Sequence, residues 1–150
     1  MRIRKATEED SHLIAVFERL GIQHPWTEKM IRQDLVENPR STYLVGEIPD
    51  CAGEMMMTGF IGACQILDEV EINNIVVAPA FRKMGTGRAL LSALKEYGIE
   101  RGAEHFYLEV RSRDAGVIEF YKKNGYVSTA VRKDYYTEPV DDAVLMKLEV

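Results

Sequence analysis

The segment from Glu71 to Val110 constrains the fold more than any other part of the chain. It begins with a strand through Val77, which Pro79 ends because proline cannot continue a β-ladder. Gly85 and Gly87 follow and open a helix, and alternating apolar and polar residues beyond that helix predict a second strand. A strand, a helix and a strand in this order are expected to place the two strands parallel, with a right-handed crossover. The chain is therefore expected to form an α/β or α+β fold.

The rest of the chain predicts further elements on both sides of this unit. Strands are expected at residues 2–5, 43–45, 57–66, 71–77, 105–110, 126–131 and 143–148, and helices at 7–21, 27–38, 85–101 and 115–123. Helices interleaved with strands in this way indicate a mixed sheet with helices on both of its faces. A length of 150 residues is typical of one domain, which would span residues 1–150.

The charge balance is acidic, with 19 Lys and Arg residues against 24 Asp and Glu, a formal net charge of −5. This balance argues against binding to nucleic acid or to an anionic membrane, because both attract positive charge. No stretch approaches the ~18 apolar residues of a membrane span, and no apolar run typical of a signal peptide follows the N-terminus. We expect a cytoplasmic protein in which a local basic patch holds any anionic ligand.

The two cysteines, Cys51 and Cys64, are too few for a disulfide framework and lack the spacing of a metal site. No metal is therefore expected. We interpret both cysteines as small buried apolar side chains, while one bridge between them is also compatible with the sequence.

The loop before the helix at 85–101 supplies the basic patch. Arg82, Lys83 and Arg88 are positive, and residues 78–88 contain no acid. Glycine lets backbone N–H groups approach a ligand closely, and a helix N-terminus favours negative charge. No Lys-Ser or Lys-Thr pair follows the glycines, and Leu90 stands where a dinucleotide fingerprint needs its last glycine, so two common phosphate loops are excluded. The alternative is a glycine-rich turn that only caps the helix.

The pattern Arg82-x-x-Gly85-x-Gly87 after a strand resembles the acetyl-CoA loop of the GCN5-related N-acetyltransferase (GNAT) superfamily. Within it, the chain is most similar to the RimI-like group, which acetylates the N-terminal alanine of a ribosomal protein. Four further segments carry this resemblance, which covers essentially the whole chain: residues 24–29, 108–111, 120–126 and 132–136. It implies a twisted, mostly antiparallel mixed sheet of about seven strands.

The resemblance also implies acetyl-CoA as co-substrate and identifies the residues that would bind it. The amides of the loop would bind the pyrophosphate, and the strand before it would hold the acetyl group and pantetheine arm through its backbone. The implied cofactor residues are Ile75, Val76, Val77, Arg82, Lys83, Met84, Gly85, Thr86, Gly87 and Arg88. Asp114 stands where the family commonly has a cofactor-binding asparagine, and the contact is carried over to it. An ionised aspartate still caps a helix, but it cannot donate a hydrogen bond and its charge would repel phosphate.

Glu109 and Tyr121 are the catalytic candidates. Glutamate is depleted in strand interiors, and the family places its general base at the position of Glu109. The alternative for Glu109 is an exposed carboxylate paired with Arg111. Tyr121 matches the family's general acid, twelve residues further on; alternatively, it forms a core face with Val117 at helical spacing.

For the acceptor, the resemblance points to Pro25 and Trp26 on one side and to Tyr135 and Tyr136 on the other. Aromatic residues in loops suit a peptide groove, because they combine an apolar body with a polar tip. Trp26 could instead form a hydrophobic staple for the helix that follows it. The implied partner is a protein N-terminus, including that of a ribosomal protein. The alternatives are a small amine or a lysine side chain as acceptor, and an acyl-CoA-binding module without catalysis.

Overall fold

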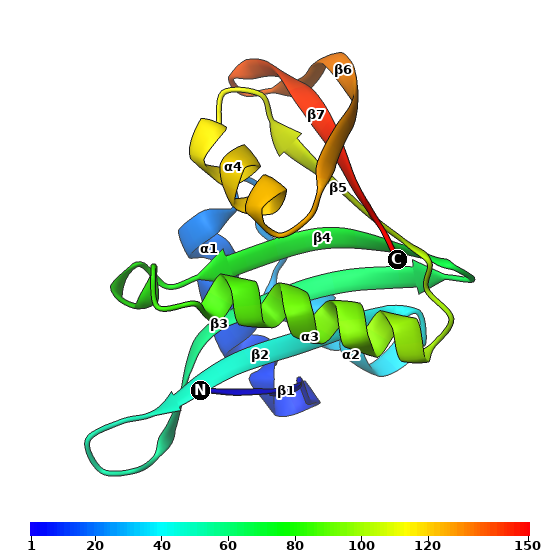
Figure 1. Cartoon of the computed structure of the whole chain (residues 1–150). Helices are drawn as coiled ribbons and strands as arrows, with labels where there is room; N and C mark the ends of the chain where they lie inside the picture. Colours follow the sequence, from blue (N-terminus) through cyan, green and yellow to red (C-terminus); the bar gives the residue numbers. More distant parts are fainter.

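The computed structural model describes residues 1–150, and its strands and helices follow one another in the predicted order (Figure 1). The elements are β1 (Arg2–Lys5), η1 (Glu8–Asp10), α1 (Ser11–Gly21), α2 (Glu28–Glu37), β2 (Ser41–Pro49), β3 (Met55–Ile66), β4 (Glu69–Val77), η2 (Pro79–Phe81), α3 (Thr86–Glu100), β5 (His105–Arg111), α4 (Ala115–Lys123), β6 (Val127–Thr137) and β7 (Val140–Glu149). None of the helices combines the length and apolarity that crossing a membrane requires.

All seven strands belong to one mixed sheet with the order β1-β2-β3-β4-β5-β7-β6. Every neighbouring pair is antiparallel except β4 and β5, which are parallel. The predicted parallel unit and the mostly antiparallel mixed sheet are both confirmed.

The parallel pairing between β4 and β5 is short. It runs only from Glu69 opposite His105 to Glu71 opposite Tyr107. The register of β4 against β3 then shifts between Gly62 and Ala63, so that Asn73 is left without a partner in β3. Such a bulge bends a strand. Beyond it β4 and β5 separate, and in Figure 1 the lobe of β5, β6, β7 and α4 stands apart from the sheet of β1–β4. A cleft lies in this separation.

Two apolar cores cover the two faces of the β1–β4 sheet. Phe60 and Ile61 are neighbours in β3 and are both fully buried, because successive side chains of a strand point to opposite faces. Ile61 belongs to the core under α3, with Leu90 and Leu94, whereas Phe60 belongs to the core under α1 and α2. The prediction of helices on both faces is confirmed (Figure 1).

Two local expectations are corrected. The strand predicted at 126–131 extends to Thr137 as β6, with an irregular register between Arg132 and Tyr136, so the aromatic pair Tyr135–Tyr136 lies in a strand and not in a loop. Cys51 is exposed in the turn between β2 and β3, and Cys64 is only half-buried; both are free thiols. The interpretation of both cysteines as buried apolar side chains was wrong.

Candidate active site

A cleft of about 600 Å³ occupies the gap between β4 and β5. Its walls come from α1, the connector between α1 and α2 (residues 22–27), β4, β5, α4 and β6. It brings together residues that the sequence predicted for three different roles: Trp26, Ile75, Glu109, Asp114, Tyr121, Tyr135 and Tyr136. Pro25, Val76, Val77 and the basic loop (residues 82–88) do not line it.

Glu109 projects from β5 with a quarter of its side chain exposed. One carboxylate oxygen lies 3.5 Å from Nη1 of Arg132 on β6. A hydrogen bond to Glu109, together with the charge of its carboxylate, raises the pKa of the Tyr135 hydroxyl. In the alternative interpretation Glu109 pairs with Arg111; in the structure its cationic partner is Arg132.

Tyr121 projects from α4, and its ring is buried between aromatic neighbours. The ring centroids of Phe120 and Tyr126 lie 5.3 and 5.6 Å away, both edge-on. Burial raises the pKa of the Tyr121 phenol well above its ordinary value of 10.0. The side chain lines the cleft, so a buried phenol that stays protonated at neutral pH borders the same space as the Glu109 carboxylate.

The basic loop forms an anion-binding geometry at the start of α3. Lys83 and Gly85 adopt left-handed conformations with φ of 63° and 86°. Helical hydrogen bonding begins only with Ala89, which donates to the Gly85 carbonyl, so the N–H groups of residues 83–88 have no acceptor in the protein. Successive free N–H groups in a turn make a concave site for anions. The side chains of Arg82, Lys83 and Arg88 add positive charge, and these residues fit a pyrophosphate.

The two glycines of this loop have different roles. Gly85 needs its left-handed backbone, and a Cβ there would meet no neighbouring atom. A Cβ on Gly87 would lie 3.1 Å from Cζ of Phe120, so Gly87 lets α3 and α4 approach each other.

The end of β4 offers backbone groups to the cleft side. Ala78 donates a hydrogen bond to the Thr58 carbonyl at 2.9 Å. Because residues of an antiparallel strand alternate in direction, Val76 also faces β3, while the N–H and carbonyl groups of Ile75 and Val77 face away from it. Arg82 closes this end by donating from Nε to the Val77 carbonyl at 3.3 Å.

Asp114 stands at the N-cap of α4, where the sequence places it, but its side chain makes no capping hydrogen bond. The expectation that this carboxylate caps the helix is corrected. Instead the exposed side chain lines the cleft.

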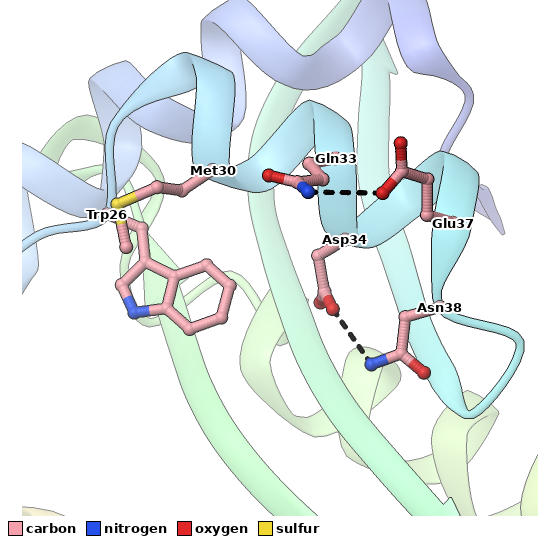
Figure 2. A pocket seen from close by; sticks show the side chains of 6 residues that line it. All are labelled: Trp26, Met30, Gln33, Asp34, Glu37 and Asn38. Atoms are coloured by element: carbon pink, nitrogen blue, oxygen red, sulfur yellow. Dashed lines mark hydrogen bonds between the residues drawn. The ribbon is translucent and has the colours of Figure 1, made fainter.

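Trp26 borders two hollows at once. It lines the cleft, and on the outer side it lines a groove along α2 with Met30, Gln33, Asp34, Glu37 and Asn38 (Figure 2). Thr27 caps α2 by accepting a hydrogen bond from the Met30 N–H at 3.2 Å. Trp26 therefore lies both beside the first turn of α2 and at the cleft. A role in acceptor binding and a role as a hydrophobic staple for α2 are compatible with this position.

Arg111 and Glu18 also line the cleft, and the sequence had indicated no site role for either. Arg111 donates to the Pro139 carbonyl and to Gln23 Oε1, both at 2.8 Å, and lies 4.3 Å over the ring of Tyr136. Glu18, on α1, is 2 % exposed and lines the cleft. Their partners lie far away in the sequence, so no local pattern could have revealed these contacts; the only signal was a charged residue in an otherwise apolar helix or strand.

Comparison with known proteins identifies a family. The sequence model of the "Acetyltransferase (GNAT) family" matches residues 6–126. The [ribosomal protein bS18]-alanine N-acetyltransferase of Escherichia coli (strain K12) is 32% identical over 128 residues, which are 84% of this chain and 82% of that protein. The protein of the same name from Haemophilus ducreyi is 28% identical and covers 97% of this chain and 98% of its own.

Solved structures agree with the sequence comparison. The crystal structure of the Escherichia coli ribosomal-protein-S18-alanine N-acetyltransferase superposes with a TM-score of 0.83 at 28% identity, over 99% of this chain and 93% of that one. The structure of Ard1 from Thermoplasma volcanium gives the same TM-score and identity, over 99% and 97%.

Proposed function

Because the chain belongs to the GNAT family of acetyltransferases, we propose that it transfers the acetyl group of acetyl-CoA to the N-terminal α-amine of a protein, the N-terminal alanine of a ribosomal protein in particular. One domain, residues 1–150, would carry the whole reaction. The observation that carries this proposal is the cleft itself, where a carboxylate and a buried phenol meet the aromatic residues proposed for the acceptor. The names of the similar bacterial enzymes support the ribosomal acceptor.

The cofactor would be held by two groups of residues. The N–H groups of the basic loop, with Arg82, Lys83 and Arg88, would bind the pyrophosphate. The backbone groups of Ile75 and the N–H of Val77, which face away from β3, would hold the pantetheine arm and face the developing oxyanion. Asp114 would border the cofactor without donating to it. When bound, acetyl-CoA supplies the activated thioester.

Glu109 acts as general base in this proposal. An α-amine has a pKa of about 7.7–8.0, so roughly a tenth to a fifth of it is neutral near pH 7, whereas a lysine amine near 10.4 is far less available. A carboxylate can therefore suffice to take the proton of the attacking amine, directly or through one water.

Tyr121 acts as general acid. Because burial raises its pKa, the phenol keeps its proton at neutral pH and is available as a donor. Tyr121 lines the cleft in which the departing thiolate would form, and would donate to its sulfur as the C–S bond breaks, while the amine loses its proton to Glu109.

Trp26, with Pro25 beside it on the connector, and the pair Tyr135–Tyr136 would flank the acceptor chain.

A panel of acceptors tests the proposed function. It contains an alanine-starting peptide with the N-terminal sequence of the ribosomal protein, a lysine peptide with a blocked N-terminus, and polyamines. Each is incubated with acetyl-CoA and the protein, and the products are identified by mass spectrometry. We expect the first to be acetylated. If only the lysine peptide or the polyamines are acetylated, the acceptor is a lysine side chain or a small amine and not a protein α-amine. If no acceptor is acetylated although acetyl-CoA binds, the protein is an acyl-CoA-binding module without catalysis.

A further inference from the structure

Glu18 is a buried titratable group that the proposed mechanism does not use. Its carboxylate accepts hydrogen bonds from two neutral donors, the backbone N–H of Trp26 at 3.3 Å and the side-chain amide of Asn74. No lysine, arginine or histidine forms an ion pair with it, and burial raises its pKa. A carboxylate buried without a cation is costly, so its two hydrogen bonds must be favourable enough to hold it there.

These two hydrogen bonds join opposite sides of the site. Trp26 belongs to the connector, at the acceptor side, while Asn74 follows the bulge of β4 and immediately precedes Ile75, at the cofactor side. Asn74 and Glu18 are 56 positions apart in the sequence. The end of α1 also rests directly on β4, because a Cβ on Gly21 would lie 3.1 Å from Cγ1 of Val76.

We propose that Glu18 is a positioning residue, which fixes the connector against β4 and thereby sets the place of Trp26 relative to the acetyl-binding strand. The consequence for the connector is structural and independent of the reaction. The consequence for acceptor binding rests on the proposed function.

Fluorescence tests the structural consequence, because Trp26 is the only tryptophan of the chain. Glu18→Gln keeps the shape of the side chain but replaces one acceptor oxygen with an NH2 group, which donates and cannot accept. Asn74→Leu removes the side-chain amide that donates to Glu18 from β4. In both variants we expect the Trp26 emission to shift to longer wavelength and acrylamide quenching to increase, because a released connector exposes the indole. The matched control is Glu96→Gln, an exposed position on α3, which should leave both signals unchanged.

Steady-state kinetics test the consequence for the acceptor. Losing a hydrogen bond to a charged group should raise the KM for the alanine-starting peptide about tenfold in Glu18→Gln. The Kd for acetyl-CoA and kcat should stay near the wild-type values, whereas simple misfolding would lower kcat and leave KM unchanged. The double variant with Asn74→Leu should show less than the product of the two single effects, since both act on one contact.

The outcomes separate the two proposals. Unchanged Trp26 fluorescence in both single variants, or an unchanged peptide KM in a wild-type enzyme that acetylates the peptide, would overturn the role of Glu18. If the wild type acetylates no peptide, the proposed function fails, and the fluorescence of Glu18→Gln still decides whether Glu18 holds the connector. Should Glu18→Gln not fold, Asn74→Leu carries both measurements.

Discussion

Arg111 donates a hydrogen bond from Nη2 to Gln23 Oε1 at 2.8 Å, across 88 positions of sequence. The same guanidinium donates to the carbonyls of Glu138 and Pro139, in the turn between β6 and β7. One side chain at the end of β5 thus holds two segments of the proposed acceptor end of the cleft, the connector and this turn.

Arg111→Lys should loosen both segments, because lysine keeps the charge but not the planar fork that bonds several acceptors at once. We expect a loss of about 1 kcal/mol in the free energy of unfolding, measured in urea, and a raised KM for the peptide acceptor. Gln23→Leu should raise the peptide KM in the same direction with a smaller loss of stability. If Arg111→Lys has the wild-type midpoint of urea unfolding and the wild-type KM for the peptide, the contacts of Arg111 are dispensable.

Glu109→Gln should lower kcat at least about 100-fold, since a positioned general base contributes roughly 10²–10⁴-fold. The Kd for acetyl-CoA, measured by calorimetry, should not change. Glu71→Gln is the matched control, because Glu71 also lines the cleft and its substitution changes the charge equally. Equal kcat values in the two variants would remove Glu109 from the mechanism.

Gly85→Ala should weaken acetyl-CoA binding. Alanine in the left-handed conformation of Gly85 costs about 1–2 kcal/mol, and a loop that relaxes from it moves the N–H groups of residues 83–88. An increase of the dissociation constant by about tenfold corresponds to this strain. Gly116→Ala in α4 is the control, because a Cβ there meets no neighbour and the backbone is not left-handed. A wild-type dissociation constant in Gly85→Ala would contradict the anion-binding role of the loop.

Stability should fall in acid through the contacts of Arg4. This guanidinium lies 2.8 Å from Asp10 and 2.9 Å from Glu47, and its hydrogen bonds lower the pKa of both carboxyls below their ordinary 3.8 and 4.5. A carboxyl whose pKa is lower in the folded state adds stability above its ordinary pKa and loses it as the pH falls through the folded value. We therefore expect the free energy of unfolding to decline below about pH 4.5.

Arg4→Met isolates this contribution. The variant should lose about 3 kcal/mol at neutral pH, because it leaves two largely buried carboxylates with fewer partners, and its stability should depend less on pH below 4.5 than that of the wild type. Urea unfolding at a series of pH values measures both. If the free energy of unfolding falls equally with pH in the wild type and in Arg4→Met, the Arg4 contacts are not the source of the acid sensitivity.

Local patterns were sufficient to predict the order of the elements. Proline and glycine mark where β4 ends and α3 begins, and alternation identifies β5. The extension of β6 through Tyr135 and Tyr136 was missed, because its charged residues and irregular register hide the alternation of a strand. The cysteines were misplaced because a small apolar residue in a turn, such as Cys51, carries no signal for its exposure.

The site was predictable only where chemistry and sequence position coincide. Glu109 stands out because a carboxylate is unusual in a strand, and the structure places it in the cleft with Tyr121. Its partner Arg132 could not be inferred, because the pairing depends on the order in which β5, β7 and β6 lie in the sheet. The same holds for Glu18 and Arg111, whose contacts exist only after the chain has folded.

The central claim, acetylation of a protein α-amine, is tested most directly with two peptides that differ only at their N-termini. Both begin with alanine and contain lysine, and one carries a formyl group on its α-amine. With acetyl-CoA and the purified protein, fragmentation mass spectrometry should find one acetyl group on the alanine of the free peptide and none on the formylated one. Acetylated lysine in both peptides, with an unmodified α-amine in the first, would contradict the account.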